Sequence, residues 1–78
     1  MSIETQIISE IARALEVDES SISVNTMNSD VDEWDSLGQI SILVRLDLIF
    51  NNVSERVPAL ASVSSVKEIV ELIATDLG

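Results

Sequence analysis

The sequence contains no cysteine and no histidine, and only four of its 78 residues are basic. Without cysteine there are no disulfides, and without either residue the chain lacks the usual protein ligands of zinc and copper. The same absences remove the side chains that most often serve as nucleophile or general base near neutral pH. A Ser-His-Asp triad is excluded, and only paired carboxylates are left for acid–base chemistry. We therefore expect a protein that is not an enzyme and that holds no metal.

Fourteen acidic residues against four basic ones give the chain a formal net charge of −10. Such a surface repels the phosphates of nucleic acids and the headgroups of anionic lipids, and it favours basic partner proteins. No apolar run approaches the ~18–20 residues that a membrane span requires, and the first residues do not resemble a signal peptide. We expect a soluble, cytoplasmic monomer that neither binds nucleic acid nor inserts into a membrane.

Hydrophobic residues make up 46% of the chain, and their spacing predicts an all-α fold. Apolar side chains recur at intervals of three and four over residues 3–15, 36–50 and 66–77, which is typical of amphipathic helices. We expect a single domain, residues 1–78, folded as a small four-helix bundle. It would have three longer helices, one short helix, and a long loop between the first two helices.

Several residues mark the expected ends of these helices. Ser2 is a candidate N-cap for the first helix, because its hydroxyl can accept a hydrogen bond from an unpaired backbone N–H group. Ser65 followed three residues later by Glu68 fits a capping box for the last helix. Ser54 and Pro58 could each start the short helix, and the sequence leaves its first residue open.

The loop expected over residues 17–35 is unusually long for a compact domain, and loops of this length more often serve a function than not. Four apolar residues of the loop are spaced so that their side chains could pack into the core beneath it and tether the loop. They are Ile22, Val24, Met27 and Val31. The segment from Glu16 to Asp35 contains seven acids and no base. These acids form either an ordinary solvated face or a contact surface for a basic partner protein. In the second case the main contact residues would be Asp30, Asp32 and Glu33.

The pattern Asn28-x-Asp30-x-Asp32 invites comparison with a calcium-binding loop. An EF-hand requires a glycine at the turn and a closing glutamate, and this chain has Glu33 and Gln39 at those positions. We therefore do not expect a specific calcium site.

The most informative residues are Asp35 and Ser36, where the acidic loop ends and an apolar helix begins. Both residue types favour a helix N-terminus, where their oxygens can accept hydrogen bonds from unpaired N–H groups. The positive end of the helix dipole would also favour a phosphate placed on Ser36. The two residues are thus either a simple helix cap or a cap next to an attachment site, and these roles are compatible.

The motif Asp35-Ser36-Leu37, with the apolar run after it that ends in Leu46-Asp47 and Phe50, resembles the attachment motif of the acyl carrier protein family. The motif lies near the middle of a small acidic chain, and the resemblance extends from about residue 3 to residue 73. In that family the serine carries a 4′-phosphopantetheine arm through a phosphodiester. The resemblance implies that Ser36 is the attachment residue and that Asp35 contacts the transferase that loads it.

The resemblance implies a discrete acyl or aminoacyl carrier that tethers thioester intermediates and presents them to partner enzymes. Its expected partners are a phosphopantetheinyl transferase, a loading ligase, and downstream synthase or transferase enzymes. The cargo is left open among fatty acyl, hydroxyacyl, polyketide and amino acid groups.

Two features depart from the common pattern of the family. Many carriers have a small pair such as Gly-Ala before the motif aspartate, whereas this chain has Glu33-Trp34 and resembles a Trp-Asp-Ser-Leu variant. We expect Trp34 to be a half-buried anchor of the loop. The helix after the motif lacks the usual acids, and Arg45 cancels the charge of Asp47, so partner contacts would be more apolar and the loop would supply the acidity.

The helix after Ser36 carries two apolar stripes when its residues are placed at ~100° intervals. The first stripe is expected to face the core, and the second lies on roughly the opposite side. The second stripe is either buried by another part of the fold or exposed for a partner; in the family, positions matching Leu37, Ile40 and Val44 face partners. The core stripe comprises Ile42, Leu43, Leu46, Ile49 and Phe50, and the second comprises Leu37, Ile40, Val44 and Leu48.

Two other classes of function compete with a carrier. One is an unmodified, small acidic helical interaction module that binds a basic partner protein, since the same charge and the same stripe would serve it. The other is an enzyme or calcium binder based on carboxylates, which the residue pattern supports least.

Overall fold

The structure, a computed structural model, describes residues 2–78. Within this range the chain forms four α-helices, and the three longer ones are joined by short 3-10 helices and loops. This confirms the expected all-α fold with three longer helices, one short helix and a long first loop. The α-helices are α1 (Ile3–Leu15), α2 (Ser36–Ile49), α3 (Val53–Arg56) and α4 (Val66–Leu77), and the 3-10 helices are η1 (Glu19–Ser21), η2 (Asn28–Asp30) and η3 (Pro58–Ser62).

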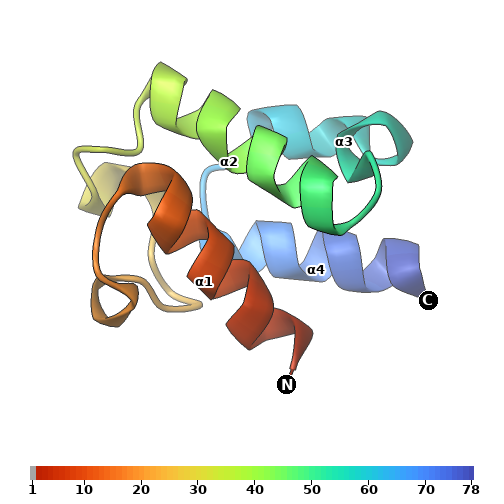
Figure 1. The fold of residues 1–78 in the computed structure, drawn as a ribbon, viewed down its shortest axis with the longest axis horizontal. Coiled ribbons are helices and arrows are strands. Elements are labelled where there is room, and N and C mark those ends of the chain that lie inside the picture. The colour runs from red at the N-terminus through yellow and green to blue at the C-terminus, as the bar shows by residue number, and fades with distance from the viewer. Residues whose placement is uncertain (1) are drawn as a thin grey trace.

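The helix α1 packs mainly against α2 and, less extensively, against α4. Figure 1 shows α2 along the top of the molecule and α4 beneath it, while α1 lies at the lower left and runs from the loop side down to the N-terminus. The long loop gathers at the end of the bundle where α2 begins. This arrangement places the first turn of α2 beside the loop that precedes it.

The core is built from isoleucine, leucine and valine side chains that the helices and η3 turn toward one another. Ile11 of α1, Ile42 of α2 and Ile73 of α4 are completely buried. Truncating a buried isoleucine or leucine to alanine costs about 2–5 kcal/mol, so each of these contacts matters to a domain of this size. The other fully buried large side chains are Ile7, Leu46, Val53, Leu60, Val66 and Ile69.

The helix caps follow the prediction with one difference. Ser2 Oγ accepts a hydrogen bond from the Thr5 N–H, and Ser65 Oγ accepts one from the Glu68 N–H, each at 3.2 Å. The Glu68 carboxylate, however, accepts from the Ser64 N–H at 3.1 Å, whereas a capping box requires the N–H of Ser65 itself. The hydrogen bond from the Ser64 N–H, helped by the hydroxyls of Ser64 and Ser65, lowers the pKa of Glu68 below its ordinary value.

The long loop is tied to the start of α4 by its backbone. The Asn28 N–H donates to the Ser64 carbonyl at 2.8 Å, and the Val66 N–H donates to the Thr26 carbonyl at 3.0 Å. Met27 lies between these bonds with its side chain exposed, so the expectation that it tethers the loop through the core is wrong. The backbone makes the connection there, and of the expected tethers only Ile22 is buried.

A short helix begins at or next to each of the two residues that were candidates for the start of the short helix. The helix α3 begins one residue before Ser54, whose N–H and hydroxyl each donate to the Asp47 carboxylate of α2 at 2.8 Å. Pro58 begins η3. Arg56, between them, donates to the Phe50 carbonyl at 2.8 Å and pairs with Asp76 of α4 at 2.9 Å. The segment after α2 is therefore held to both α2 and α4 by polar contacts.

Candidate functional site

The helix α2 is capped by Asp35, not by Ser36. Asp35 has an extended backbone, and its Oδ1 accepts a hydrogen bond from the Gly38 N–H at 2.9 Å. Ser36 is the first residue of the helix; its side chain is exposed, and its hydroxyl makes no hydrogen bond within residues 2–78. Because a neighbouring residue performs the capping, the Ser36 oxygen is left accessible.

The backbone around Ser36 favours a negative group. The Gly38 N–H is used by the cap and the Gln39 N–H by the Asp35 carbonyl, whereas the N–H groups of Ser36 and Leu37 have no acceptor within residues 2–78. Unpaired N–H groups and the positive end of the helix dipole together make the start of a helix an anion site. A phosphate joined to the Ser36 oxygen would lie at this end of α2.

A groove opens beside Ser36, with a volume of about 570 Å³. One wall comes from the end of the loop and the first turn of α2, and the other comes from η3 and the residues before α4. Hydroxyl and amide side chains alternate with apolar ones along it, so the groove suits an extended ligand with both polar and apolar parts. The lining residues are Asn28, Trp34, Asp35, Ser36, Gln39, Ile40, Ala61, Ser62, Val63 and Ser64.

Trp34 lies between the groove and the core and is more deeply buried than expected, with 5% of its surface exposed. Its indole N–H donates to Gln39 Oε1 at 2.7 Å, and Gln39 Nε2 donates to the Leu60 carbonyl at 3.0 Å. A buried indole N–H needs an acceptor, and Gln39 supplies one while also joining α2 to η3. Gln39 was not predicted to belong to this site, although a polar residue within reach of a buried tryptophan was the available signal.

Gly38 allows the loop to approach α2 closely. A Cβ atom at this position would lie 2.2 Å from the Glu33 carbonyl oxygen and 2.8 Å from Leu15 Cδ2, and both distances are far inside normal contact. The absence of a side chain at Gly38 therefore permits the end of the loop to lie against the first turn of α2. Sequence reasoning missed it, although an isolated glycine inside a helical pattern often has a packing reason.

The three loop acids predicted to receive a partner are exposed, which agrees equally with a contact surface and with an ordinary solvated face. The Oδ2 atom of Asp30 accepts a hydrogen bond from the Met27 N–H at 2.9 Å, while Asp32 and Glu33 form no side-chain hydrogen bond within residues 2–78. Within residues 2–78 no group of three or more acidic side chains is placed so that it could hold a metal ion.

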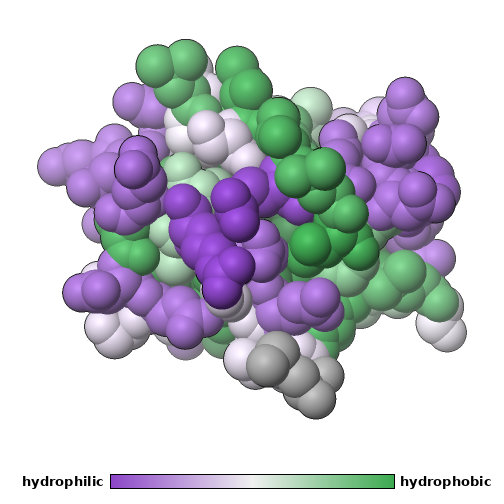
Figure 2. All heavy atoms as spheres, in the orientation of Figure 1, coloured by the Kyte–Doolittle hydropathy of each residue, from purple (hydrophilic) through white to green (hydrophobic). Residues whose placement is uncertain are grey.

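The second apolar stripe of α2, consisting of Leu37, Ile40, Val44 and Leu48, lies on the surface. Each of the four side chains is between 54% and 79% exposed, so the alternative in which the helix is buried on both sides is wrong for the isolated chain. Figure 2 shows a band of hydrophobic side chains that follows α2 across the molecule. Of the expected core stripe, Ile49 in the last turn of α2 is exposed and Leu43 is only partly buried, so the prediction is wrong for Ile49. The other three residues are buried, as expected: Ile42, Leu46 and Phe50.

In the part of the chain that the structure describes, no helix combines the length and the apolar character needed to cross a bilayer. Comparisons with protein-family models, with curated proteins and with solved structures give no match for this chain.

Proposed function

We propose that this chain is a discrete carrier protein that holds an acyl or aminoacyl group on a 4′-phosphopantetheine arm attached to Ser36. The observation that carries the proposal is the Ser36 hydroxyl, which is exposed at the first residue of α2 and relieved of capping by Asp35. The motif Asp35-Ser36-Leu37 and its position in a small acidic helical domain support the same assignment.

The residues around Ser36 fit a phosphodiester and an extended arm. The unpaired N–H groups of Ser36 and Leu37 favour the negative charge of the phosphate. The adjoining groove offers about 570 Å³ beside the hydroxyl. On its far wall the hydroxyls of Ser62 and Ser64 donate to the Ala59 carbonyl and to the Glu68 carboxylate, so their oxygens could still accept a hydrogen bond from the arm. When bound, the arm supplies a thiol that carries the cargo as a thioester, and the chain itself has no cysteine.

The chain would position the Ser36 hydroxyl and provide the surface that a transferase recognises, while the transferase would supply the catalysis. Asp35 holds the first turn of α2, so the Ser36 oxygen is presented at a defined place at the end of the bundle. Asp30, Asp32 and Glu33 would attract a basic transferase, and Leu37 would make an apolar contact next to the attachment residue. Surface charges of this kind raise association rates more than they tighten binding, which suits a carrier that must be released.

The test of attachment is co-expression with a promiscuous phosphopantetheinyl transferase, followed by intact-mass measurement. We expect one arm per chain in the wild type and none in Ser36→Ala. Ser62→Ala is the matched control, because it removes another exposed hydroxyl of the same groove. An unmodified wild type with several different transferases, or an arm that persists in Ser36→Ala, would overturn the proposal.

The role of the loop acids has its own test. Replacing Asp30, Asp32 and Glu33 by Asn, Asn and Gln should slow loading by the transferase and flatten the dependence of the loading rate on salt, because screening acts on the charges that have been removed. An unchanged rate with an unchanged salt dependence would assign these acids to an ordinary solvated face.

The second candidate is an unmodified interaction module that binds a basic partner protein. The observation in its favour is the exposed apolar stripe together with the exposed loop acids, which would form a protein contact with or without an arm. An intact mass that stays unmodified with every transferase, while a basic partner binds the loop acids, would select this function.

A further inference from the structure

A second groove, with a volume of about 420 Å³, lies between the C-terminal part of α1 and the middle of α2. Its apolar lining comes from Ala14 of α1 and from two residues of the exposed stripe, Ile40 and Val44. Its polar lining includes Arg13 and Arg45. Ser36 does not line this groove, although Ile40 lines both this groove and the one beside Ser36.

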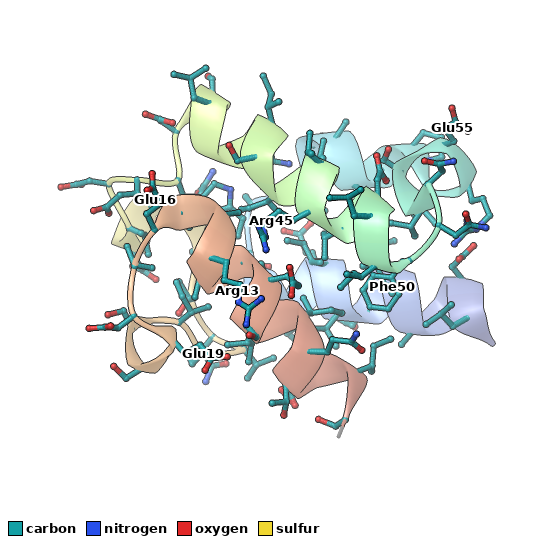
Figure 3. The ribbon with its side chains drawn as sticks, viewed as in Figure 1. Arg13, Glu16, Glu19, Arg45, Phe50 and Glu55 are labelled. Atoms are coloured by element: carbon teal, nitrogen blue, oxygen red, sulfur yellow. The ribbon has the colours of Figure 1, made fainter. Side chains whose placement is uncertain are left out.

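The charge of this groove differs from that of the rest of the surface. Two of the four basic residues of the chain line it, and Glu16 is the one acid among the lining residues. Figure 3 shows Arg13 and Arg45 on the same face of the molecule, one from each helix, with Glu16 at the end of α1. The lining residues thus carry two positive charges and one negative charge in a chain whose net charge is −10, and Glu10, which does not line the groove, pairs with both arginines.

Both arginines keep hydrogen-bonding capacity after their contacts within the chain. Arg45 Nε donates to Glu10 Oε1 at 3.0 Å, and Arg13 Nη1 lies 3.9 Å from Glu10 Oε2. The Glu10 side chain is only 14% exposed, while those of Arg45 and Arg13 are 38% and 65% exposed. The Nη groups of Arg45 make no hydrogen bond within residues 2–78, so they remain free to meet a carboxylate from outside.

The other two bases do not offer the same combination. Arg56 is occupied by Asp76 and by backbone carbonyls at the end of α2. Lys67 is exposed on α4 and lines none of the grooves described above. Arg13 and Arg45 therefore differ from Arg56 and Lys67, because they combine unused guanidinium N–H groups with exposed apolar side chains beside them in the α1–α2 groove.

We propose that the α1–α2 groove is a docking site for a segment of a partner protein that presents an apolar side chain flanked by a carboxylate. The apolar side chain would pack on Ile40 and Val44, and the carboxylate would bond to the guanidinium groups of Arg13 and Arg45, which suit planar carboxylates. A basic segment would meet two guanidinium groups and a single lining acid, Glu16, and a second copy of this chain would bring together two charges of −10. The acidic loop therefore suits basic partners, while this groove suits partners with a local acid. The proposal does not depend on modification of Ser36.

The experiment is selection of a random linear peptide library on the purified wild-type chain, with the selected peptides then synthesised and their affinities measured by fluorescence polarisation. We expect peptides that combine an acidic residue with a neighbouring Leu, Ile or Phe. Their Kd should rise about tenfold in Arg13→Gln/Arg45→Gln, the size expected when a hydrogen bond between charged groups is lost. Lys67→Gln removes one positive charge outside the groove, where the double variant removes two within it, and it should leave Kd unchanged.

A second variant guards against loss of folding, because removing both arginines leaves Glu10 unpaired. Val44→Asp leaves both members of the Glu10–Arg45 pair in place. Its new carboxylate in the groove should compete with the carboxylate of the peptide for the arginines and so prevent the peptide from binding. Leu77→Ala, at an exposed apolar residue of α4, is the control for loss of apolar surface. Selection of basic peptides, selection of no peptide, or peptides that bind both groove variants like wild type would overturn the proposal, whatever the result at Ser36.

Discussion

Replacing Gly38 by alanine tests how the loop and α2 fit together beside Ser36. In an exposed helix this change is stabilising, because alanine favours the helix over glycine by about 1 kcal/mol. Here the new Cβ atom would lie 2.2 Å from the Glu33 carbonyl oxygen, whereas ordinary contact begins at 3.4 Å. The carbonyl belongs to the backbone, so relief requires movement of the whole loop end. Leu15 Cδ2, at 2.8 Å, crowds the same position.

The two effects have opposite signs, and their sizes decide the outcome. Overpacking in a well-packed interior typically costs about 1–3 kcal/mol, which exceeds the gain of about 1 kcal/mol in helix propensity. We therefore expect Gly38→Ala to lower the free energy of unfolding by about 1 kcal/mol, equivalent to a fall in Tm of about 4–8 °C for a domain of this size. The Asp35 cap and the loop acids would shift with the displaced loop, so, if Ser36 carries the proposed arm, its transfer to Ser36 should also slow.

Urea unfolding followed by Trp34 fluorescence and by circular dichroism measures this effect, and Trp34 is the single tryptophan of the chain. Ser41→Ala is the matched control, because Ser41 is an exposed residue of the same helix that makes no side-chain hydrogen bond within residues 2–78. The control should be unchanged or slightly more stable. If Gly38→Ala is as stable as Ser41→Ala or more so, the close approach between Gly38 and Glu33 does not exist and the reasoning fails.

Three further predictions concern stability. Arg56→Gln should lower the free energy of unfolding by about 1–2 kcal/mol in urea titrations, because it removes the hydrogen bonds of a charged group that join α3 to α2 and α4. The ion pair with Asp76 is partly exposed, so the expected loss lies at the low end for hydrogen bonds of charged groups. Gln39→Leu should cost about 1–3 kcal/mol and change the Trp34 emission spectrum, because the buried indole N–H loses its acceptor; Gln39→Glu, which retains an acceptor, should keep more of the wild-type spectrum. The pKa of Glu68 is lowered mainly by the Ser64 N–H, so its contribution is complete above the pKa of the unfolded glutamate and is lost as the pH falls through the lower folded value. Thermal melts across the acidic range should show that loss in wild type and a smaller one in Glu68→Gln.

The helices of this fold could be predicted from local sequence patterns, namely the spacing of apolar residues and the residues that cap helices. The intervals of three and four in residues 3–15 and 66–77 required α1 and α4 to bury one face each, and the serines at positions 2 and 65 set where those helices begin. These features depend on neighbours within one turn, which is why the sequence alone was sufficient. The same holds for the long loop, whose turn-forming residues and lost periodicity were visible without coordinates.

The candidate site was foreseen only in part. The sequence singled out Asp35 and Ser36 but left open which of them caps α2, because both residue types can do so. The structure assigns the cap to Asp35 through its bond to the Gly38 N–H and thereby leaves the Ser36 hydroxyl accessible. The apolar stripe was likewise visible, whereas its exposure depended on where the other helices packed.

Other features arose from contacts between segments that are distant in the chain. The Arg45 side chain meets Glu10 of α1, 35 residues earlier, and Gln39 reaches the Leu60 carbonyl, 21 residues later. No periodicity encodes such pairs, because they depend on how α1 and η3 lie against α2. Local sequence patterns set which helices form and which of their faces are apolar. The packing of the helices sets which apolar face remains in water and which charged side chains lie beside it. The physical reason is that helix formation is set by neighbours a turn apart, while exposure and charge pairing are set by the packing of whole elements.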